Sequence, residues 1–164
     1  MNKKIYIKIG ILLVLGLCIL AGCSTRQEGK YTIEDLDNLA EIRIYSAENN
    51  ELINTISDEE QLYQYNQRSF LDDSDIVERQ NELKQELEGA TEQYYFISYK
   101  YPVAHFGKKE LEKNITITLY EDTKIIKMTV AGESIKGFSI PEEFLTFYYE
   151  ISEEDMNFYR SLAE

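Results

Sequence analysis

The chain has 164 residues, and its 43% hydrophobic content is too high for a generally disordered protein. Its formal net charge is −13. The first 22 residues hold three of the 17 Lys and Arg and none of the 30 Asp and Glu, which leaves −16 after residue 22. So acidic a surface repels phosphate backbones and argues against nucleic-acid binding. It would suit a basic partner, although solubility alone also explains the charge.

The chain starts with the basic sequence MNKK and continues into an apolar run from Ile9 to Gly22. Such a run would span about 21 Å as a helix, which is less than the roughly 30 Å hydrocarbon core of a bilayer. This length is typical of a signal peptide. The alternative is an uncleaved membrane anchor that extends back to Ile5. The run ends in the sequence LAGC at residues 20–23, and polar residues follow.

These four residues, Leu20-Ala21-Gly22-Cys23, resemble the lipobox of bacterial lipoproteins. The resemblance implies that the Cys23 thiolate accepts a diacylglyceryl group and that a signal peptidase cleaves between Gly22 and Cys23. Cys18 is the weaker candidate because Leu17, a poor residue at that site, precedes it. Two acyl chains give stable anchoring. We therefore expect a lipid-anchored protein on the outer side of the cell membrane, with a signal peptide at 1–22, a polar tether at 23–30 and a single domain at 31–164.

The first part of the domain predicts a helical turn, a hairpin and a short helix. A capping-box pattern at Thr32 predicts one or two helical turns over residues 32–40. Residues 42–56 predict a β-hairpin, because Ile42 and Ile44 alternate with other residues and two asparagines supply the turn. Ser57, three residues before Glu60, predicts the start of a short helix.

The middle of the domain predicts a longer helix and then a strand. Residues 74–89 contain good helix formers with a cap at Ser74 or Asp75, a thin apolar stripe and Gly89 as the stop. The thin stripe predicts loose packing. Residues 92–101 carry apolar or aromatic side chains on both faces, which favours a central strand.

The C-terminal third gives the clearest strand pattern. Residues 115–140 predict a three-strand antiparallel meander with about one turn every ten residues, and its third strand contains Phe138 and Ile140. Helical spacing follows Pro141 in residues 144–151, and a last helix is capped at Ser152. These patterns predict an α+β fold, with a mostly antiparallel β-sheet and helices packed on one side.

Few residues form a pattern that carries chemistry. His105 is the only histidine, and Cys23 is the only cysteine left after cleavage, so we expect no metal site or disulfide built on these residue types. Ser134 lies between glycines but is one residue off the spacing of a nucleophile elbow. Asp73 and Asp75 alternate like calcium ligands but lack the third ligand and the glycine of a calcium loop. We expect no catalytic residue, no cofactor and no metal.

Two longer segments carry a second resemblance. EIRIYSAENNELINTISDEEQL and ITITLYEDTKIIKMTVAGESIKGFSIPEEF resemble a family of uncharacterised lipoproteins from Gram-positive bacteria. The shared features are an asparagine-containing hairpin followed by Ser-Asp-Glu-Glu, and a late strand ending in Ile-Pro-Glu-Glu-Phe. The resemblance covers roughly residues 35–150. It implies location and architecture but no activity.

Three functions fit these observations. The leading one is a non-enzymatic binding or interaction module, attached to the membrane through diacylglycerol on Cys23. The full chain has 13 tyrosines, which are suited to a half-buried sheet face or to a contact surface with a protein partner. The second is an immunity or inhibitor lipoprotein whose acidic surface meets a cationic toxin or hydrolase. The third is a small hydrolase or a metal-dependent enzyme, which the missing motifs disfavour.

Overall fold

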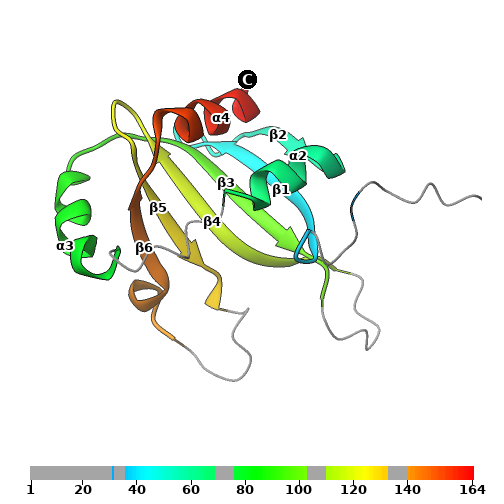
Figure 1. The fold of residues 1–164 in the computed structure, drawn as a ribbon, viewed down its shortest axis with the longest axis horizontal. Helices are drawn as coiled ribbons and strands as arrows, with labels where there is room; N and C mark the ends of the chain where they lie inside the picture. The colour runs from blue at the N-terminus through cyan, green and yellow to red at the C-terminus, as the bar shows by residue number, and fades with distance from the viewer. Residues whose placement is uncertain (1–30, 32–35, 69–75, 103–109, 133–139) are drawn as a thin grey trace, which may run out of the picture.

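A computed structural model describes residues 31, 36–68, 76–102, 110–132 and 140–164. They form a six-stranded antiparallel sheet with three α-helices, which confirms the predicted α+β class (Figure 1). The spatial order of the strands is β2-β1-β3-β4-β5-β6. Their bounds are β1 Leu39–Ser46, β2 Leu52–Ile56, β3 Glu92–Lys100, β4 Glu112–Tyr120, β5 Ile125–Val130 and β6 Thr146–Glu150. The helices are α2 Glu59–Asn66, α3 Ile76–Glu86 and α4 Glu153–Ala163, and a 3-10 helix, η2, covers Glu142–Leu145.

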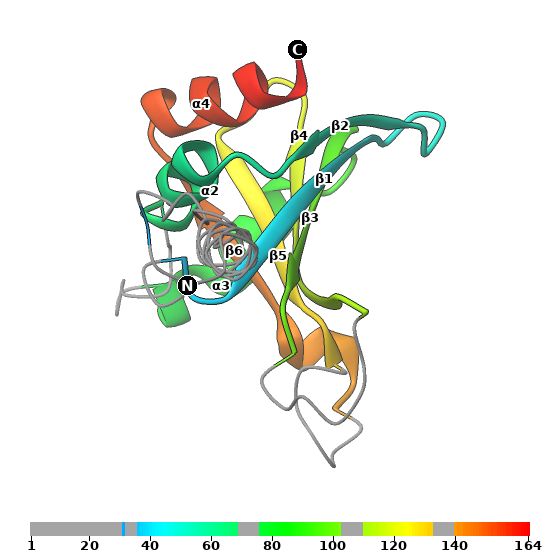
Figure 2. The same ribbon diagram turned by 90° about the vertical axis from the view of Figure 1, so that its right-hand side faces the viewer.

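The first two strands form the predicted hairpin, which projects from the rest of the molecule in Figure 2. Its turn includes Asn50 with φ 58°, a left-handed conformation that asparagine tolerates. The helical turn predicted before this hairpin is wrong in its described part. Asp37 and Asn38 have φ 50° and 59°, so they turn the chain directly into β1 at Leu39. Residues 32–35 lie outside the described part.

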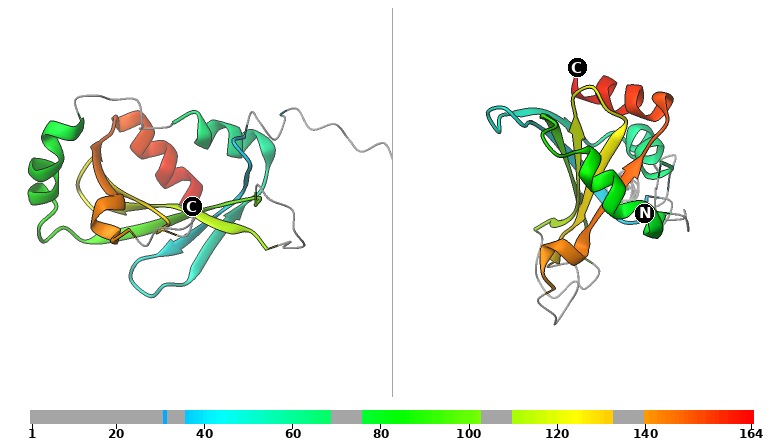
Figure 3. Two further views of the ribbon diagram at one scale, coloured as in Figure 1. Left: turned by 90° about the horizontal axis from the view of Figure 1, so that it is seen from below. Right: turned by 90° about the vertical axis from the view of Figure 1, so that its left-hand side faces the viewer.

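Two helices, α2 and α4, pack on one face of the sheet (Figures 2 and 3). Fully buried residues of this core are Ile42, Ile44, Phe96, Leu119, Ile126 and Tyr159. The α4 cap is Ser152, as predicted, and its hydroxyl accepts a hydrogen bond from Asp155 N at 3.0 Å. The α2 cap is Asp58 rather than Ser57, since the Asp58 carboxylate accepts the bond from Gln61 N at 3.1 Å.

The third helix, α3, packs on the other face, beside β6 at the edge of the sheet (Figure 1). Leu83 and Leu87 are buried there against Tyr120 and Ile125. The alternation of β4 and β5 turns these last two residues away from the face that α2 and α4 cover. Gly89 follows the helix with φ 86°, a conformation that favours glycine, which confirms the predicted stop.

The prediction for residues 138–151 is wrong in its details. The third strand of the meander is Thr146–Glu150 rather than the segment around Ile140. The predicted helical segment 144–151 is therefore mostly strand, and only its first two residues belong to a helix, the 3-10 helix η2. Phe138 lies outside the described residues. The prediction assigned the wrong repeat to the apolar residues of this segment. Phe147 and Tyr149 point to the main core while Tyr148 points to α3, and this two-residue alternation is that of a strand. The rest of the meander, β4 and β5, matches the prediction.

Candidate functional site

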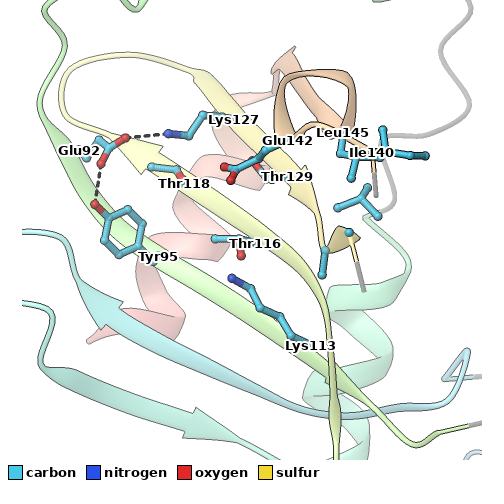
Figure 4. A pocket seen from close by; sticks show the side chains of 13 residues that line it. Glu92, Tyr95, Lys113, Thr116, Thr118, Lys127, Thr129, Ile140, Glu142 and Leu145 are labelled. Atoms are coloured by element: carbon cyan, nitrogen blue, oxygen red, sulfur yellow. Dashed lines mark hydrogen bonds and ion pairs between the residues drawn. The ribbon is translucent and has the colours of Figure 1, made fainter. Parts of the chain in front are cut away.

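The candidate site is a groove on the face of the sheet that α2 and α4 leave uncovered (Figure 4). Its volume is about 560 Å³, which falls in the usual range of ligand pockets. Strands β3, β4 and β5 form its floor, and η2 with the preceding Ile140 forms one side.

The floor consists of two rows of side chains that run across the strands. Pairing between strands places Thr118 beside Tyr95 on one side and beside Lys127 on the other. The next row joins Thr116 to Thr129. Strand alternation puts all of these side chains on one face, because the intervening residues of β4 and β5 point into the core. The rows give the groove a polar floor of hydroxyl groups.

A charged cluster closes one end of the groove. The Glu92 carboxylate accepts hydrogen bonds from Lys127 Nζ at 2.8 Å, from the Tyr95 hydroxyl at 2.5 Å and from the Tyr120 hydroxyl at 3.3 Å. Figure 4 shows Tyr95, on the same strand as Glu92, and Lys127, on β5, both directed toward Glu92. The cluster holds these side chains in fixed positions, because three donors converge on one carboxylate.

Burial and these hydrogen bonds shift the pKa values of the cluster. Partial burial alone would raise the pKa of Glu92, but the hydrogen bonds from Lys127 and Tyr95 outweigh it and lower the pKa. Burial alone would lower the pKa of Lys127, and the bond to Glu92 outweighs it and raises the pKa. The Glu92 bond also raises the pKa of Tyr95. Each shift favours a charged carboxylate, a charged amine and a neutral phenol at neutral pH.

The other end and the side of the groove differ in character. Lys113 lies at the end opposite Glu92, and Glu142 and Leu145 of η2 form the side (Figure 4). Gly132 brings the backbone close to this side, since a Cβ atom there would lie 3.6 Å from Leu145 Cδ1. The groove thus offers hydroxyl groups, one aromatic ring and charges of both signs.

One group of the floor is available for a further hydrogen bond. The Thr116 hydroxyl oxygen is buried and has no hydrogen-bond partner in the part of the chain that the structure describes. A buried hydroxyl without a partner is destabilising, and a ligand or a water molecule that bonds to it relieves that cost. The groove is therefore suited to binding a polar ligand with several donors and acceptors.

The structure does not describe the sequence-predicted site residues. Gly22, Cys23, Asp73, Asp75, His105 and Ser134 all fall outside the described residues. The expected lipidation and cleavage at Cys23 therefore remain predictions. Within the described ranges, no three His, Cys, Asp or Glu side chains are grouped so that they could hold a metal ion. None of the helices described combines the length and apolarity needed to cross a membrane.

Sequence reasoning missed the groove, although part of its signal was present. The alternation of Ile115 and Ile117 with Thr116 and Thr118 predicts one polar face on β4. That pattern does not show which strands lie beside it, so Glu92 and Lys127 could not be paired from the sequence. The side wall could not be found either, because the pattern predicts Ile140 in the third strand of the meander and does not show that η2 lies beside the sheet.

Comparisons with known proteins add no functional evidence. No protein-family model, no curated protein and no solved structure matches the chain.

Proposed function

We propose that the chain is a membrane-anchored extracytoplasmic lipoprotein that acts as a non-enzymatic binding module through the groove of Figure 4. The lipobox at residues 20–23 supports the anchor. The observation that carries the binding role is the polar floor of the groove, where the Thr116 hydroxyl has no hydrogen-bond partner among the described residues. Hydroxyl groups beside a tyrosine ring and charges of both signs suit a polar ligand rich in hydroxyl groups, such as a short saccharide.

The anchor is tested by Cys23→Ala in the full chain. We expect the wild-type protein to incorporate labelled palmitate and to sediment with membranes, because a diacylglyceryl group buries two alkyl chains. The variant should lose the label and keep its uncleaved leader. Cys18→Ala is the matched control and should behave as wild type. A Cys23→Ala protein that still carries palmitate would overturn the proposed anchor.

The groove is tested by photocrosslinking in the cell. A photoreactive residue replaces Glu142 at the side of the groove in one strain and Gln64 on the opposite face of the sheet in another. We expect a carbohydrate adduct at position 142 only. Equal labelling at the two positions, or none at position 142, would contradict ligand binding in the groove.

One observation favours the second candidate function, an inhibitor or immunity protein. Phe144 is 67% exposed and directly follows the exposed Glu142 and Glu143 on η2. An exposed aromatic side chain next to acids suits a basic protein surface. A basic protein crosslinked at position 142, with binding lost on Phe144→Ala, would select this function over a saccharide-binding module.

A further inference from the structure

A second cavity lies on the other face of the sheet, at the end that the helix layer leaves open. It has a volume of about 290 Å³ and lies between α2 and strands β3 to β5. Its floor is apolar and is formed by Leu39, Ile115, Ile117, Met128 and Val130. The rings of Tyr65 and Tyr159 bound it on the helix side, in edge-on contact with their centroids 5.7 Å apart.

Among the described residues that line this cavity, Tyr65 carries a buried hydroxyl to which a ligand could bond. Tyr65 is 9% exposed, and its hydroxyl oxygen is buried with no hydrogen-bond partner among the described residues. The other buried hydroxyl, that of Ser98, is already satisfied: it donates to Ile115 O at 3.2 Å and accepts from Ile115 N at 3.1 Å. A water molecule would need two to four polar partners, and the apolar residues of the floor supply none of these.

The charged residues around the cavity are already paired. Lys100 forms an ion pair with Asp37, and Arg68 Nε lies 3.1 Å from Asp155 Oδ1. The Arg68 guanidinium also lies over the Phe158 ring, 3.8 Å from its centroid. A charged ligand would compete with these partners and would lose hydration on burial. The cavity therefore favours an uncharged ligand.

We propose that this cavity binds an uncharged amphiphile: an alkyl or aryl body whose hydroxyl, ester or amide oxygen bonds to the Tyr65 hydroxyl. A cavity of about 150 Å³ holds benzene, so a cavity about twice that size accepts a body of about two rings or an alkyl chain of similar volume. The apolar floor accommodates that body. The Tyr65 hydroxyl then selects for an oxygen atom at the position where the bare hydroxyl would otherwise stay unpaired.

The test uses 2-naphthol as the probe and the methionine methyl groups as reporters. The full chain has three methionines. Met128 lines the cavity, whereas Met156 is buried in the core outside it. In a chain labelled with ¹³C at the methionine methyls, 2-naphthol should shift the Met128 signal and leave that of Met156 in place. The free probe concentration is measured in each sample. A shift of Met156 alone, or none at Met128 up to the solubility limit, would overturn the proposal.

Comparison of ligands and variants tests the role of the hydroxyl. Naphthalene should bind roughly fivefold more weakly than 2-naphthol, a factor that corresponds to a net hydrogen bond of about 1 kcal/mol. The charged 2-naphthoate should also bind more weakly than 2-naphthol. Tyr65→Phe should abolish the preference for naphthol over naphthalene. The control Tyr95→Phe removes a hydroxyl on the opposite face of the sheet and should retain the preference for naphthol over naphthalene. A preference that persists in Tyr65→Phe would contradict the proposal.

A filling variant tests the location independently. Ile115 lines this cavity but not the groove of Figure 4. Ile115→Phe puts a ring into the cavity and should abolish binding of 2-naphthol and of naphthalene, while the Met156 signal keeps its position, which reports an intact core. Unchanged probe binding in this variant would place the site elsewhere. This outcome is separate from the groove, because the substituted residue does not line it and the probes do not resemble the polar ligand proposed there.

Discussion

At the scale of single residues, Glu92 controls the charged end of the groove. Its carboxylate receives three hydrogen bonds from side chains on β3, β4 and β5, so one short side chain joins three strands. Tyr95, Tyr120 and Lys127 are all oriented by this one acceptor. The groove would lose its shape at this end if the acceptor were lost.

We expect Glu92→Gln to lower the free energy of unfolding by about 1 kcal/mol at pH 7, since the amide keeps the size of the side chain and loses the ion pair. The folded pKa of Glu92 is lowered, so its contribution is fully present above the unfolded pKa of about 4.3. It is lost as the pH falls through the folded pKa. Urea unfolding at pH 7 and at pH values below 4 measures the difference.

The comparison with Lys127→Met strengthens this test. That variant removes the other partner, and its effect should likewise disappear in acid. The free energies of unfolding of wild type and Glu92→Gln should therefore converge in acid. If their difference stays constant from pH 7 down to acid, the ion pair does not stabilise the fold.

At the scale of elements, the two edge strands of the sheet differ in how far they are covered. Strand β6 is covered by α3, and the Gln80 side chain replaces a neighbouring strand there. Gln80 Nε2 donates to Tyr148 O at 2.8 Å, and Gln80 Oε1 accepts from Tyr148 N at 2.8 Å. Strand β2, at the opposite edge, exposes Leu52 and Ile53. An uncovered edge strand is a template for pairing, and α3 removes that hazard at β6.

We expect Gln80→Ala to lower the free energy of unfolding by about 1–2 kcal/mol, because two hydrogen bonds to the β6 backbone are lost. The uncovered edge should also promote self-association, which sedimentation velocity measures over a range of protein concentrations. Gln85→Ala is the control on an exposed position of the same helix. Equal behaviour of the two variants would show that Gln80 does not protect the edge.

Local patterns in the sequence predicted most of the elements correctly. The hairpin, the central strand, the helix ending before Gly89 and the first two strands of the meander follow from alternation, turn residues and stop signals. The errors occur where two patterns coincide. Phe144, Phe147 and Ile151 fit helical spacing, but pairing with β5 makes residues 146–150 of this segment a strand. The groove depends on such pairings between distant residues, so the sequence could not predict it.

At the scale of the whole molecule, the acidic charge opposes folding. With a net charge of −13, the exposed carboxylates repel one another on average, and compaction brings them closer. Exposed ion pairs such as Lys124–Glu153 offset little of this repulsion, because such pairs contribute little in water.

We therefore expect salt to stabilise the protein. Raising NaCl from 10 to 100 mM shortens the Debye length from about 30 Å to about 10 Å, so repulsion between distant carboxylates is screened. The melting temperature should rise by about 2–4 °C, which corresponds to about 1 kcal/mol for a chain of this size. Calorimetry in NaCl and in KCl separates screening from binding of a specific ion. A melting temperature that falls with salt would show that ion pairs outweigh the repulsion.

The position of Tyr31 bears on how the molecule would stand at a membrane. Its ring stacks on Tyr63 with centroids 4.2 Å apart, and its hydroxyl donates to Glu60 at 2.9 Å, so this end of the chain is attached to α2. Tyr31 is eight positions after the proposed anchor at Cys23, and a fully extended chain over eight positions reaches at most about 29 Å. The tether would then be short enough to keep the α2 side of the domain next to the lipid headgroups. The groove lies on the opposite face of the sheet and would face away from the membrane, toward the outside of the cell.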